Sequence, residues 1–152
     1  MPPTHTPAQH LRRFLAKYSP EIAAQGRRAL AKMRKRLPGA TEMVYDNYNG
    51  LVIGFGPTDK PSLAIFSILL MPGHVTLCFL QGANIPDPNR RLKGGGNLVR
   101  HIRLIPPGVL DDPEILDLMN AALYRAKVPI NPKSQRRLII KSISAKQRPR
   151  RK

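Results

Sequence analysis

The fold is decided by residues 41–56, which read TEMVYDNYNGLVIGFG. Apolar side chains recur along this stretch with a period of two, and Asn49-Gly50 lies between its halves. A period of two is typical of β-strands, and Asn-Gly between two such runs is the strongest short-range signal for a β-hairpin. The stretch therefore predicts two antiparallel strands, Met43–Tyr48 and Leu51–Phe55, joined by a tight turn.

The same period continues to residue 105 and predicts three further strands, Leu63–Leu70, His74–Leu80 and Leu98–Ile105. Most of the connections are short, which favours antiparallel neighbours, because parallel pairs need long crossovers. Leu63–Leu70 is apolar on both faces and is expected in the centre of the sheet. Its residues Phe66, Ile68 and Leu70 face away from the helices in one of two possible phasings. In that phasing an uncovered apolar patch would favour a homodimer or a ligand pocket.

Two helices precede the sheet. Thr6, Pro7 and Gln9 have the spacing of a capping box with proline at the first helical position. A second helix begins after Ser19-Pro20 and ends at Pro38-Gly39. Its predicted buried face consists of Ile22, Gly26, Leu30, Met33 and Leu37.

A third helix follows the sheet, and the acids Asp111, Asp112 and Glu114 complement its N-terminus. The sequence thus predicts an α+β domain over residues 1–128: two helices, a five-stranded antiparallel sheet and a C-terminal helix. Residues 129–152 form a basic tail, which is either mobile or adds a sixth, edge strand through Leu138-Ile139-Ile140 and Ile143.

The net charge of +17 is concentrated at the two ends of the chain. Residues 1–37 carry nine Lys or Arg against one acid, residues 131–152 carry nine against none, and the segment between them is neutral. This pattern is expected of a protein that meets a polyanion, although it also serves solubility. We expect nucleic acid as the partner.

Three groups of cations are candidates for anion binding. The first is a column on the second helix, which a solvated helix face also explains: Arg28, Lys32 and Arg36. The second belongs to the long segment Gln81–Asn97 and the strand after it, where charges also protect a sheet edge: Arg90, Arg91, Lys93, Arg100, His101 and Arg103. The third is in the tail: Arg136, Arg137, Lys141, Lys146, Arg148, Arg150, Arg151 and Lys152.

The run Gly94–Gly96 lies among the second group of cations. Phosphate-binding loops place such glycines between a strand and the N-terminus of a helix, whereas here a strand follows. A turn is therefore favoured over a phosphate cradle.

Catalytic and cofactor motifs fail to match. There is no Gly-x-Ser-x-Gly, no P-loop and no His-Glu-x-x-His, and Cys78 has the pattern of a small core residue. We expect no enzyme, no cofactor and no membrane span, and a cytoplasmic protein because a secretory signal is lacking. Glu42 and Asp46 lie four apart on one strand and are weak candidates for a metal site.

Five segments follow one another in a recognisable order: Glu42–Tyr45, Leu77–Leu80, Pro86-Asp87-Pro88, Leu92–Gly94 and Gly96–Ile102. With them, residues 8–127 resemble the YdhG-like family of bacterial domains of unknown function. The most specific part is Asp-Pro, then Leu-x-Gly-x-Gly, then Arg-His-Ile.

The resemblance implies a frataxin-like α-α-β(5)-α fold with the helices on one face of the sheet. One branch of the family is described as an intracellular iron chaperone, and frataxin-type proteins present acids of the first helix and strand to iron. The corresponding acids here are Glu21, Glu42 and Asp46. We therefore expect a non-enzymatic domain that contacts nucleic acid or another polyanion through its basic helices and tail. The alternative is a frataxin-like carrier of iron or of a small ligand.

Overall fold

A computed structural model describes residues 5–104 and 107–152. Its α-helices are α1 (Pro7–Ala16), α2 (Pro20–Arg36) and α3 (Pro113–Tyr124). Its strands are β1 (Thr41–Asp46), β2 (Leu51–Gly56), β3 (Phe66–Met71), β4 (His74–Phe79), β5 (Arg100–Arg103) and β6 (Arg137–Ile143). Short 3-10 helices lie at η1 (Pro61–Leu63), η2 (Gly82–Asn84) and η3 (Pro107–Asp111).

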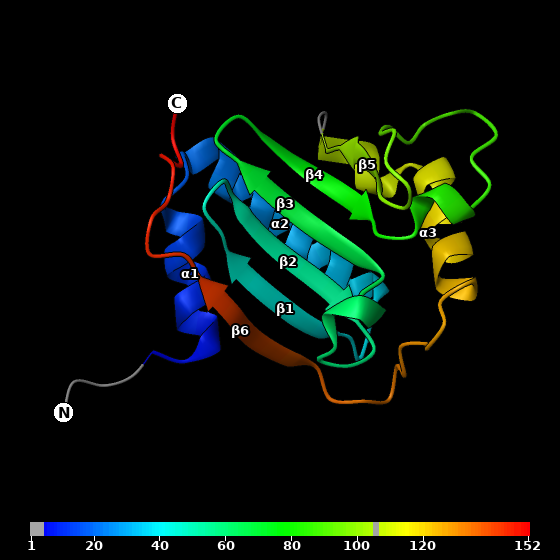
Figure 1. The fold of residues 1–152 in the computed structure, drawn as a ribbon, viewed down its shortest axis with the longest axis horizontal. Helices are drawn as coiled ribbons and strands as arrows, with labels where there is room; N and C mark the ends of the chain where they lie inside the picture. Colours follow the sequence, from blue (N-terminus) through cyan, green and yellow to red (C-terminus); the bar gives the residue numbers. More distant parts are fainter. Residues whose placement is uncertain (1–4, 105–106) are drawn as a thin grey trace.

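The strands form one six-stranded sheet in the order β5-β4-β3-β2-β1-β6 (Figure 1). The first five strands pair with their neighbours in antiparallel fashion, and β6 alone is parallel, to β1. The predicted α+β class is confirmed, and the sheet is mostly antiparallel. The basic tail takes the edge-strand alternative, because β6 contains the expected apolar residues Leu138–Ile140 and Ile143.

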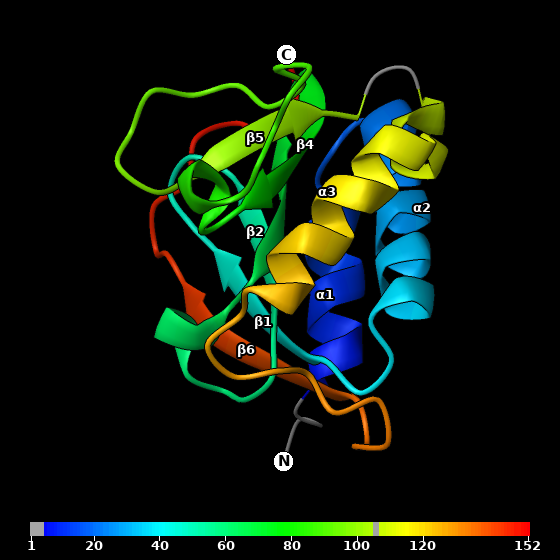
Figure 2. The same ribbon diagram turned by 90° about the vertical axis from the view of Figure 1, so that its right-hand side faces the viewer.

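All three α-helices pack on one side of the sheet (Figure 2). The side chains of Phe66, Ile68 and Leu70 belong to the core between the helices and the sheet and are fully buried. Of the two phasings of β3, the structure has the one that turns these residues toward the helices. The opposite, open face therefore receives Ser67 and Leu69, and no uncovered apolar patch forms from Phe66, Ile68 and Leu70.

The capping box of α1 forms as predicted, and two contacts connect the helical segments to the sheet. Thr6 and Gln9 form the capping box, with bonds of 2.8 and 3.2 Å between each backbone N–H and the other residue's side chain. A Cβ at Gly26 would lie 2.7 Å from Cδ2 of Leu70, so the glycine permits α2 to approach the centre of the sheet. The hydroxyl of buried Tyr18 donates to the Leu70 carbonyl and accepts from the Leu51 N–H, both at 3.0 Å.

The hairpin and several strand boundaries differ from the sequence expectation, and β1 spans Thr41–Asp46 where Met43–Tyr48 was predicted. The β1–β2 connection spans residues 47–50, with a 3.0 Å bond from the Asn47 N–H to the Gly50 carbonyl. A Cβ at Gly50 would lie 2.6 Å from the Leu70 carbonyl oxygen, so this glycine serves a close approach to β3. Strand β3 begins only at Phe66 because Leu63 lies in η1. Strand β5 spans only Arg100–Arg103, where Leu98–Ile105 was predicted, and Ile105 lies outside the described residues.

Beyond β6 the chain remains attached to the domain. Arg150 is 5% exposed, and the Arg148 N–H donates to the Tyr48 carbonyl at 2.9 Å. Pairing of β6 with β1 and burial of Arg150 place this segment against the domain, and such contacts offset the entropy of ordering. No helix within residues 5–104 and 107–152 has both the length and the apolar character needed to cross a membrane.

Candidate anion-binding site and a separate cavity

The long segment before β5 is fixed to the domain at several points. Ile85 and Leu92 are buried in the core, and the Asp87 carboxylate accepts the N–H groups of Arg91 and Leu92, each at 2.9 Å. Lys93 and His101 exchange two backbone hydrogen bonds of 2.8 and 2.9 Å. The segment is thereby held beside β5, and its cations acquire defined positions.

These contacts create a hollow of about 500 Å³ on the surface. Its lining consists of Arg90, Arg91, Lys93, His101, Ile102, Arg103 and Val109. Five of the six residues predicted for this group therefore meet in one place. No acidic side chain in the described part of the chain lines the hollow itself.

Two of the predicted residues have structural partners. Arg91 donates to Glu114 at 2.7 Å and to Asp112 at 2.9 Å, which ties the segment to the start of α3. Nη1 of Arg100 donates to the carbonyls of Gly96 (2.6 Å) and Val99 (2.9 Å), so Arg100 closes the glycine turn and does not line the hollow. Arg90, Lys93 and Arg103, which are all exposed, remain as the main cations for a ligand.

Further positive charges act on His74, at the start of β4. The pKa of His74 is lowered, first by burial and then by the charges of Arg103, Lys152 and His101. The Lys152 side chain packs beside the β3–β4 turn, where a Cβ at Gly73 would lie 2.6 Å from its Nζ. His101 and Arg103 of β5 and Lys152 of the C-terminal segment thus contribute positive charge to one basic surface around His74.

The glycine run behaves as a turn in part. Gly94 has a φ of +117°, in the region that L side chains rarely adopt. A Cβ added at Gly95 or Gly96 would have no atom within 4 Å, so neither position needs glycine for lack of space.

The helix column is engaged in ion pairs. Lys32 and Arg36 both bind the carboxylate of Asp111, the latter at 3.1 Å, and Arg36 also reaches Met119 Sδ. The column therefore connects α2 to the segment before α3. Arg28, the third member, is exposed beside them.

The tail cations divide into bound and exposed residues. Arg136 binds Glu42 at 3.2 Å, Arg150 binds Asp46 at 3.0 Å, and Lys141 donates to the Asp59 carbonyl at 2.6 Å. Arg151 donates to the Lys17 carbonyl at 3.2 Å. The remaining candidates are exposed: Arg137, Lys146, Arg148 and Lys152.

The two candidate metal ligands are both buried, and each is held by cations. Arg34 contacts both oxygens of Glu42, at 2.8 and 2.9 Å. Burial alone would raise the pKa of Asp46, but hydrogen bonds from Lys17, Gln147 and Arg150 outweigh it and lower that pKa. Within residues 5–104 and 107–152, no three His, Cys, Asp or Glu side chains are grouped to hold a metal ion.

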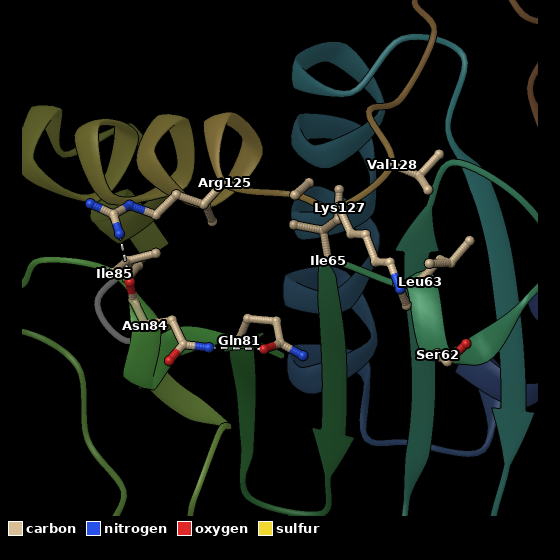
Figure 3. A pocket seen from close by; sticks show the side chains of 12 residues that line it. Ser62, Leu63, Ile65, Gln81, Asn84, Ile85, Arg125, Lys127 and Val128 are labelled. Atoms are coloured by element: carbon tan, nitrogen blue, oxygen red, sulfur yellow. Dashed lines mark hydrogen bonds between the residues drawn. The ribbon is translucent and has the colours of Figure 1, made fainter.

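A second site, which the sequence did not indicate, is a cavity of about 230 Å³ near the end of α3 (Figure 3). It is lined by Ser62, Leu63, Ala64, Ile65, Gln81, Asn84, Ile85, Ala122, Arg125, Ala126, Lys127 and Val128. These residues come from separate segments around η1, η2 and the end of α3, so no local motif marks the cavity.

Cys78 also differs in part from expectation. It is half-buried on the open face of the sheet, opposite His101 in the β4–β5 register. Burial raises the pKa of its thiol, which disfavours the reactive thiolate.

Comparison of the chain with protein-family models, with curated proteins and with solved structures finds no match.

Proposed function

We propose that this protein is a non-enzymatic binding domain that contacts the phosphates of nucleic acid, or of a similar polyanion, through the hollow beside β5. The single observation that carries the proposal is the meeting of Arg90, Arg91, Lys93, His101 and Arg103 in that hollow. Three exposed cations there face solvent, whereas many cations of α2 and of the tail are bound to carboxylates or carbonyls.

Phosphate contacts explain why such a surface would bind without reading sequence. Lys and Arg that neutralise phosphates release counterions, and this term is independent of base sequence. Stacking on aromatic side chains would add affinity for single strands, but only 5% of the residues are aromatic and there is no tryptophan. We therefore expect similar affinities for unrelated sequences of equal length.

The proposal is tested by fluorescence anisotropy with a labelled duplex over a series of salt concentrations. Log K falls as log salt rises, and this slope should become less steep by about 2.7 in the triple variant Arg90→Gln/Lys93→Gln/Arg103→Gln, at about 0.9 per lost contact. The control Arg12→Gln/Arg27→Gln/Lys35→Gln removes the same charge from exposed positions on α1 and α2.

The two triples separate a site from general attraction to a basic protein. A site in the hollow predicts a small change in slope for the control and the full change for the hollow variant. Equal, small effects of both triples, or feeble binding of the unmodified protein at 50 mM salt, would remove the hollow from this role.

We also propose that the chain is a cytoplasmic relative of the YdhG-like family with a frataxin-like core. The order of two helices, five antiparallel strands and a helix supports this, with β6 as an addition at the sheet edge. An experimental structure in which the helices are oriented on the sheet differently from those of frataxin would argue against this proposal.

A further inference from the structure

We infer that the cavity at the end of α3 binds a small organic anion with an apolar body and a carboxylate head. This inference is independent of nucleic-acid binding, because none of the cavity's lining residues belongs to the hollow beside β5. It rests on the size of the cavity, on its apolar walls and on the two cations at its rim.

The walls of the cavity suit an apolar group. Four aliphatic side chains line it, those of Leu63, Ile65, Ile85 and Val128. The alanines Ala64, Ala122 and Ala126 are small, which leaves the space between η1 and α3 unfilled. Burial of an apolar ligand against these walls would supply most of the binding free energy.

The volume limits the size of that group. A dry apolar cavity of about 150 Å³ in another protein holds benzene, and pockets for drug-sized ligands measure about 300–1,000 Å³. At about 230 Å³, this cavity suits a single ring or a short alkyl chain with one small head group.

The rim selects the charge of the head group. Arg125 and Lys127 extend from the end of α3 to different sides of the cavity, as Figure 3 shows. Nη1 of Arg125 donates to the Asn84 carbonyl at 3.1 Å, and Nδ2 of Asn84 donates to Gln81 Oε1 at 3.0 Å. These bonds hold the guanidinium at the rim.

The chemistry of these groups favours an anionic head, and the small volume favours a planar carboxylate over a bulkier phosphate. A guanidinium has five N–H donors in a planar fork, which matches the two oxygens of a carboxylate. Among the described residues, no acidic side chain lines the cavity, so nothing on its walls neutralises Arg125 and Lys127. The amides of Gln81 and Asn84 can also donate to the head group.

The test uses the full chain and three probes that share one ring: benzoate, benzamide and phenyl phosphate. Benzamide has nearly the shape of benzoate without its charge, so the pair isolates the contribution of the cations. Titrations followed by the methyl NMR signals of Ala122 and Ala126 should show benzoate binding about tenfold more tightly than benzamide. Arg125→Gln should weaken benzoate binding about three- to tenfold. Lys133→Gln removes an exposed cation that does not line the cavity and should leave the affinity unchanged.

A second variant tests the position of the ligand. Ala126→Leu should fill the cavity and abolish benzoate binding, whereas Ala31→Leu, at an exposed position of α2, should not. The melting temperatures and circular dichroism spectra of both variants report whether the fold is intact. Equal affinities for benzoate and benzamide, or tighter binding of phenyl phosphate, would overturn the carboxylate assignment. Unchanged Ala122 and Ala126 signals at millimolar benzoate would overturn the site.

Discussion

Nη2 of Arg150 lies 3.0 Å from Oδ1 of Asp46, and both side chains are buried. Lys17 donates to Oδ2 of the same carboxylate at 2.8 Å and Gln147 does so at 2.9 Å. The Arg150 guanidinium also lies over the ring of Tyr18, 5.9 Å from its centroid. These contacts join α1, β1 and the segment after β6, so part of the basic tail is a structural element of the domain.

Replacing this arginine should destabilise the protein. Arg150→Met removes one partner of a buried carboxylate, and we expect the free energy of unfolding to fall by about 2–4 kcal/mol, because Lys17 and Gln147 retain part of the network. Chemical denaturation measures the change, with Arg148→Met at an exposed position as the control. Equal stabilities of the two variants would show that the Asp46 network does not hold the tail.

The stability of the protein should depend on the protonation of His74. Burial and the charges of Arg103, Lys152 and His101 lower its pKa from 6.5, so the unfolded state binds the proton more readily. The contribution of neutral His74 to the stability of the folded protein is therefore complete above about pH 6.5. This contribution is lost as the pH falls from there through the folded-state pKa. Thermal melts between pH 7.5 and pH 5 should show a shallower decline for His74→Gln than for the unmodified protein. Parallel curves would contradict the predicted shift.

The glycine run offers a test with internal controls. Gly94→Ala should lower stability by about 1 kcal/mol or more, because an L side chain is strained at its φ of +117°. Gly95→Ala and Gly96→Ala should change it by less than about 0.5 kcal/mol, since a Cβ meets nothing at either position. Denaturant titrations of the three variants decide this. If all three lose stability equally, the turn geometry is not what Gly94 supplies.

The sequence predicted features that depend on near neighbours. The capping residues Thr6 and Gln9, the buried face of α2 and the strand pairs around Asn49-Gly50 are all local patterns, and they appear as expected apart from the strand boundaries. The cations of the hollow beside β5 belong to this class too, because all of those that line it lie within residues 90–103.

Features that join distant segments could not be predicted. Arg150 and Arg136 bind carboxylates that are 104 and 94 positions away in the sequence. From the sequence alone, these tail cations therefore have no visible partners. The phasing of β3 was open because both of its faces are largely apolar. The cavity at the end of α3 is formed by residues that contact one another only after folding.

Exposed cations of the tail should contribute to polyanion binding where they lie near the hollow. From the sequence, deletion of residues 131–152 should lower the salt slope by about 4, at about 0.9 per phosphate contact and with half the tail cations engaged. That deletion, however, removes β6 and Arg150, so its effect would also report unfolding. Single exposed cations provide a cleaner comparison. Lys152→Gln, beside His74 and the basic surface, should lower the slope by about 0.9.

The matched variant is Arg137→Gln at the start of β6, which also removes one exposed charge but at the opposite end of that strand from the C-terminal segment (Figure 1). If binding is centred on the hollow, Arg137→Gln should leave the slope unchanged, because screening at a Debye length of about 8 Å in physiological salt confines each charge to its surroundings. Anisotropy titrations of both variants on one duplex provide the slopes. A loss of slope for Arg137→Gln equal to that for Lys152→Gln would move the binding surface from the hollow to the tail as a whole.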